Sequence, residues 1–78
     1  MALISKKFLT EISKERASIH GVVKATYSGF EVAGQKYFQI DTYGNKARQN
    51  KDTISQSLQL DRETAEYLIK LLTNHFDL

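Results

Sequence analysis

The stretch KYFQIDTYG, residues 36–44, alternates apolar and polar side chains as a β-strand requires. Successive side chains of a strand point to opposite sides of its sheet, so this stretch has two faces of different chemistry. One face carries Phe38, Ile40 and Thr42, and the other carries Tyr37, Gln39, Asp41 and Tyr43. We expect the first face to pack in a core. The second bears two tyrosines among hydrogen-bonding groups, and we expect it to bind a ligand.

The 78 residues without a cysteine predict one small domain, residues 1–78, held together without disulfides. A thiolate metal site is excluded by the same absence, and we expect no cofactor. No apolar run is long enough to cross a bilayer, and the first residues do not resemble a secretory signal. These features predict a cytoplasmic protein that does not contact a membrane.

The formal net charge of +2 is unevenly distributed. Residues 1–20 and 21–60 each carry an excess of two basic side chains, whereas residues 61–78 carry an excess of two acidic ones. The segment Thr42 to Lys51 contains three basic residues and no acidic one. This polarity favours a polyanionic partner on the side of that segment, although a solvated loop would have the same composition.

Residues 5–18 are compatible with two structures. Ile4, Phe8, Ile12 and Ile19 lie near one stripe of an amphipathic helix, and Ser5 could cap its first turn. Part of the segment also alternates as a strand does. We predict a helix, with a strand as the alternative, ending at Gly21 or just before it.

Residues 22–32 have the composition of strands, but their apolar side chains change parity along the way. Val23, Ala25 and Tyr27 are odd-numbered, whereas Phe30 and Val32 are even-numbered. A β-bulge or a break at residues 28–29 would explain the change. A compact turn at residues 33–35 then leads into residues 37–43 as a hairpin.

Residues 54–60 alternate as a third strand, and Asp61 is a suitable N-cap for a helix from Arg62 to about Phe76. The sequence therefore predicts an α+β fold, a curved antiparallel sheet of three to four strands packed against a C-terminal helix. Residues 5–18, if helical, add an N-terminal helix. The expected core consists of Phe38, Ile40, Leu58, Leu68, Ile69 and Leu72.

Tyr67 and Leu71 form a second apolar stripe beside the core-facing side of this helix. A small core makes association favourable, because it removes further apolar surface from water. We therefore expect a homodimer with Tyr67 and Leu71 at its interface.

The sequence does not indicate an enzyme. His20 and His75 have no metal-binding spacing, and no serine lies in a nucleophile motif. Glu31 and Asp41 could suggest a nuclease-like carboxylate pair, but the lysine that should follow Asp41 is absent. We expect Asp41 to pair with Lys24 or Lys36 on a neighbouring strand.

Aromatic rings for stacking, hydrogen-bonding side chains and a basic loop together are the requirements for binding single-stranded nucleic acid. Tyrosines are also common in sheets that bind nothing. The predicted nucleic-acid-binding residues are Lys24, Lys36, Tyr37, Gln39, Tyr43, Lys46, Arg48, Lys51, Ser55 and Ser57. The alternative function is a small protein-interaction or accessory module that uses an exposed strand edge or helix flank.

The order of segments from Tyr37 to Leu72, with YFQIDTY, a basic loop, ISQSLQL and a capped helix, resembles the transcriptional coactivator p15 (PC4-like) family. The resemblance implies a curved antiparallel sheet followed by one helix, a dimer, and binding of single-stranded DNA. It places Gln39 and Asp41 on the strand that in this family alternates aspartate and arginine, and it matches Lys51 to a lysine in the loop before the following strand. Thr42 stands where that family has an arginine.

Overall fold

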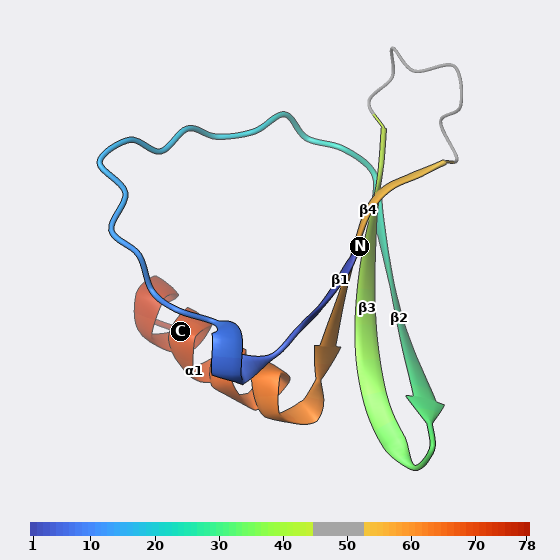
Figure 1. The fold of residues 1–78 in the computed structure, drawn as a ribbon. Coiled ribbons are helices and arrows are strands. Elements are labelled where there is room, and N and C mark those ends of the chain that lie inside the picture. Colours follow the sequence, from blue (N-terminus) through green and yellow to red (C-terminus); the bar gives the residue numbers. More distant parts are fainter. Residues whose placement is uncertain (45–52) are drawn as a thin grey trace.

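The computed structural model describes residues 1–44 and 53–78, which form one sheet and one long helix (Figure 1). The elements in chain order are β1 (Ala2–Ile4), the 3-10 turn η1 (Lys6–Phe8), β2 (Ala25–Val32), β3 (Gln35–Tyr43), β4 (Ile54–Asp61) and α1 (Arg62–Phe76). The predicted α+β class is confirmed, as are the third strand and the C-terminal helix.

The four strands lie in the order β1-β4-β3-β2. β2, β3 and β4 are antiparallel neighbours, as predicted, whereas β1 pairs with β4 in parallel, so the sheet is mixed. β1 has only three residues, Ala2–Ile4, which is too short for an alternation pattern to reveal.

The predicted bulge or break at residues 28–29 is wrong. β2 pairs with β3 without interruption from Ala25 opposite Thr42 to Val32 opposite Gln35. The change of parity is therefore real, and Tyr27 and Phe30 lie on opposite faces of the sheet. The register shifts at Thr42/Tyr43 instead, between β3 and β4.

The predicted N-terminal helix over residues 5–18 is also wrong, because only Lys6–Phe8 form a 3-10 turn. Residues 9–24 contain neither helix nor strand and arc away from the sheet before entering β2 (Figure 1). A short helix in water requires its apolar face to be packed. Ile12 and Ile19 contact little and are 68% and 100% exposed.

Asp61 begins α1 as predicted, since its Oδ1 accepts the backbone N–H of Thr64 at 2.8 Å. Interaction with the Thr64 side chain, and then the hydrogen bond from the Thr64 N–H, lower the pKa of the Asp61 carboxyl below its ordinary 3.8. A charged carboxylate at this position also favours the helix dipole. The other end of α1 is closed by Asp77 in the left-handed conformation.

The predicted core does not close within one chain. No hydrophobic side chain of residues 1–44 and 53–78 is buried, and Phe38, Ile40 and Leu58 on the sheet are 36–42% exposed. The reason is the direction of α1, which touches the sheet near its first turn and then diverges from it (Figure 1). Ala65, in that turn, lines a hollow with Phe38 and Leu60, so the helix starts on the apolar side of the sheet.

Thr64 fastens the N-terminal segment to the start of the helix, and it is fully buried. Its Oγ1 accepts the N–H of Lys6 at 2.9 Å and donates to the carbonyl of Ile4 at 3.1 Å. One hydroxyl therefore holds the end of β1 and the start of η1 against α1.

We expect Thr64→Val to lower the free energy of unfolding by about 1–3 kcal/mol, because it leaves the partly buried Lys6 N–H and Ile4 carbonyl without their partner. Thr64→Ser keeps the hydroxyl and is the matched control, with a smaller loss. Chemical denaturation at equal protein concentration measures both. Equal stability of the valine variant and the wild type would contradict this role.

The β2–β3 turn consists of Ala33 and Gly34, which both have positive φ, 52° and 78°. Two central residues with positive φ are the mark of a type I′ hairpin turn, in which asparagine is preferred at the first position. An L-residue such as alanine is disfavoured in this conformation.

We expect Ala33→Asn to raise the free energy of unfolding by about 0.5–1 kcal/mol, since asparagine tolerates the left-handed region. Ala33→Val should lower it, because a β-branched side chain is strained there. Thermal unfolding at equal protein concentration compares the three proteins. A less stable asparagine variant would refute the turn assignment.

Candidate nucleic-acid interface

The strand register brings one set of polar and aromatic side chains to the side of the sheet opposite the start of α1. Asp41 lies between Thr26 of β2 and Ser57 of β4, and Gln39 lies between Ser28 and Gln59. We call this surface the polar face. Its members are Thr26, Ser28, Phe30, Tyr37, Gln39, Asp41, Tyr43, Ser57 and Gln59.

Amide groups and a carboxylate run in a hydrogen-bonded row across the middle of the polar face. Gln59 donates from Nε2 to Oε1 of Gln39 at 2.9 Å, and Gln39 donates from Nε2 to both carboxylate oxygens of Asp41 at 3.0 Å. Asp41 is 9% exposed. The predicted pairing of Asp41 with Lys24 or Lys36 is wrong, because the neighbouring amide of Gln39 occupies the carboxylate instead.

Tyr37 lies at the hairpin end of the polar face and stacks on Phe30. The two ring centroids are 5.6 Å apart with an interplanar angle of 21°. This pair makes a broader aromatic surface than the single tyrosine expected from sequence. Phe30 was missed because its even parity was attributed to a bulge, although direct hairpin pairing already places it opposite Tyr37.

Tyr43 lies at the other end of β3, and two side chains hold its ring in place. Its hydroxyl is hydrogen-bonded to Oγ1 of Thr26 at 3.0 Å, and the Nζ of Lys24 lies 5.1 Å from the ring centroid. The ammonium over the ring is a cation–π contact, which fixes a positive charge next to an aromatic surface. Thr26 of β2, Tyr43 of β3 and Lys24, which directly precedes β2, thus form one cluster.

The other predicted residues are less closely grouped. Lys36 pairs with Glu31 and has the parity of Phe38, so it lies on the opposite side of the sheet from Tyr37. Ser57 is buried in the centre of the polar face, and Ser55 lines a shallow hollow with Tyr43 and Gly44. Lys46, Arg48 and Lys51 lie outside the described residues.

The structure offers no metal site in the part of the chain that it describes, since no three side chains of the ligating types converge there. Within residues 1–44 and 53–78, no helix has both the length and the apolar character to span a membrane.

Comparison with protein-family models, with characterised proteins and with solved structures gives no match to this chain.

Proposed function

We propose that the protein binds single-stranded nucleic acid, DNA or RNA, on the polar face. The observation that carries the proposal is the placement of two half-buried tyrosines, Tyr37 and Tyr43, at the two ends of a row along β3 that contains Gln39 and Asp41. They are six residues apart on one strand, which corresponds to about 20 Å. A nucleic-acid strand that follows β3 can stack bases at both ends of this row.

The surroundings of each ring favour stacking. Phe30 beside Tyr37 and the Thr26 hydrogen bond to Tyr43 restrict the two rings, so less side-chain entropy is lost when a base binds. Base stacking does not depend on sequence, because every base has a planar aromatic surface. The expected preference is thus for unpaired strands over a particular sequence.

The row between the rings suits the edges of bases better than it suits phosphates. The carboxylate of Asp41 lies next to Gln39; it repels phosphate, whereas the acceptor sites that Gln39 does not occupy can accept a hydrogen bond from a base amino group such as that of cytosine. The phosphates are therefore expected along the side of Lys24, and the predicted contacts of Lys46, Arg48 and Lys51 would add to the same end.

We expect a fluorescent single-stranded oligonucleotide to bind with an affinity that falls as salt rises, with a slope near −0.7 for each neutralised phosphate. Tyr37→Ala and Tyr43→Ala should each weaken binding by about 1–3 kcal/mol and leave the slope unchanged, because stacking releases no counterions. Replacing Lys46, Arg48 and Lys51 together by glutamine should reduce the slope. Fluorescence anisotropy at several salt concentrations measures both effects.

The matched control is Tyr43→Phe, which keeps the ring but loses the hydroxyl bond to Thr26. It should bind nearly as well as the wild type. Absence of binding to single-stranded DNA and RNA at low salt, up to about 100 μM protein, would overturn the proposal, since even non-specific binders are detected in that range.

A protein-interaction module is the second candidate, and the position of β2 favours it. This strand is at the edge of the sheet, has eight residues and contains no proline, so one row of its backbone groups can pair with an added strand. Such a partner would bind with little dependence on salt. Stoichiometric co-purification of one protein without nucleic acid would favour this candidate.

A further inference from the structure

We propose that the protein folds as an intertwined homodimer, in which helix α1 of a second copy packs against the apolar face of the sheet. This apolar face is the set Ala25, Tyr27, Phe38, Ile40, Leu58 and Leu60, which lies on the side opposite the polar face. The proposal is independent of nucleic-acid binding.

The single chain exposes far more surface than a compact monomer of its mass. Its accessible surface is 7398 Å², whereas a compact monomer of 8.9 kDa exposes about 4,800 Å². Its radius of gyration is 14.8 Å, against about 11.5 Å for a compact domain of this length. Part of the excess belongs to residues 9–24, and part belongs to the facing sides of the sheet and the helix.

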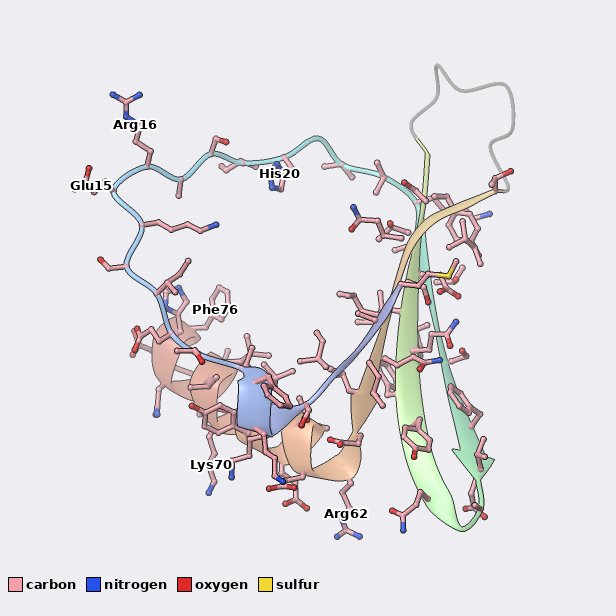
Figure 2. All side chains as sticks on the ribbon, viewed as in Figure 1. Glu15, Arg16, His20, Arg62, Lys70 and Phe76 are labelled. Atoms are coloured by element: carbon pink, nitrogen blue, oxygen red, sulfur yellow. The ribbon has the colours of Figure 1, made fainter. Side chains whose placement is uncertain are left out.

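The apolar side of α1 continues from its contact with the sheet into the open space between helix and sheet. Ile69, Leu72 and Phe76 continue the side of α1 that Ala65 turns toward Phe38, and they are 48–64% exposed. In Figure 2, Phe76 points into the open angle between helix and sheet, whereas Arg62 and Lys70 point away from it. A helix and a sheet face that meet only near Ala65 leave most of both apolar surfaces in water.

A second copy of the chain can cover both surfaces at once. In a two-fold dimer the helix of each copy can lie on the sheet of the other, so one contact is made twice. Removing half of the excess surface from each copy would bury about 2,600 Å² in total, within the range of obligate homodimers. On this face the neighbouring residues Tyr27, Ile40 and Leu58 of β2, β3 and β4 are all uncharged. The cross-strand pair Glu31 and Lys36 also lies on this face, but near the β2–β3 turn.

Residues 9–24 of the same chain are the alternative segment that could pack against the apolar face. It has no helix or strand, so burying it would leave many backbone N–H and carbonyl groups without partners. It also carries Glu11, Lys14, Glu15 and Arg16 between its apolar residues. A helix satisfies its own backbone, and α1 therefore suits an apolar surface better.

The interface differs from the one expected from sequence. Tyr67 is on the side of α1 that faces the N-terminal segment, with the Nζ of Lys6 5.3 Å from its ring centroid. Leu71 is one turn further along the same side. Leu71 and Leu72 are thus adjacent residues on different sides of the helix, and they make a matched pair for mutation.

The decisive experiment is an isotope-filtered NOESY spectrum of a mixture of labelled and unlabelled protein, combined with sedimentation equilibrium. We expect a mass of twice 8.9 kDa. We also expect intermolecular contacts between the methyl groups of Ile40 or Leu58 and the side chains of Ile69, Leu72 or Phe76. A folded monomer, or contacts of Ile40 only with residues 9–24 of the same chain, would overturn the proposal.

Mutation provides the second measurement. Leu72→Asp should weaken dimerisation by at least about 100-fold, because it places an unpaired charge in the contact, whereas Leu71→Asp should weaken it by less than about tenfold. Dissociation by Leu71→Asp alone would place the interface on the Tyr67 stripe and refute the proposal. If Leu72→Asp fails to fold, the intermolecular contacts of the wild type still decide.

Discussion

The hydroxyl of Thr64 is the interaction on which the arrangement of this chain depends. It joins the carbonyl of Ile4 and the N–H of Lys6 to the first turn of α1, and the N–H of the same residue is capped by Asp61 at the end of β4. Residues that are 58 and 60 positions apart in sequence meet at this one side chain. β1 can pair with β4 in parallel because its end is held there, and the direction in which α1 leaves the sheet is fixed at the same point.

The direction of α1 leaves apolar surface of the single chain exposed to water, which costs stability. Because α1 diverges from the sheet after Ala65, the hydrophobic effect gains little from the apolar sides of the helix and of β3 and β4. A chain of 78 residues has few other means of stabilisation, since it has no disulfide. The proposed association of two copies would remove this cost without changing the strand register or the helix cap.

The sequence predicted the elements whose signals are local. The alternation in residues 36–44, the turn at Gly34 and the cap at Asp61 each depend on neighbouring residues, and all three are confirmed. The β3 residues of the polar face could be predicted from sequence for the same reason, because alternation along a strand is a local signal. Phe30 was missed because local parity was interpreted as a bulge, and the bond from Gln39 to Asp41 was missed because a salt bridge was expected.

What could not be predicted depends on contacts between distant residues. β1 pairs with β4 and is hydrogen-bonded at its end to Thr64, and both partners are far from it in sequence. Whether residues 5–18 form a helix depends on whether a surface is present to pack Ile12. The expected core residues lie on the predicted sides of the sheet and the helix, but they are not buried against each other. The residues do share one side of the sheet and helix, yet periodicity says nothing of the angle between the two elements.

β3 takes part in both proposed interactions, because its successive side chains point alternately to the two faces of the sheet. Tyr37, Gln39, Asp41 and Tyr43 face the proposed ligand, and Phe38 and Ile40 face the proposed second copy. The two surfaces lie on opposite sides of one strand, so a bound nucleic acid need not displace the partner helix. A shift of register by one residue would exchange the faces and destroy both. The hydrogen bond from Gln59 to Gln39 opposes such a shift, since it joins β4 to β3 and forms only in the observed register.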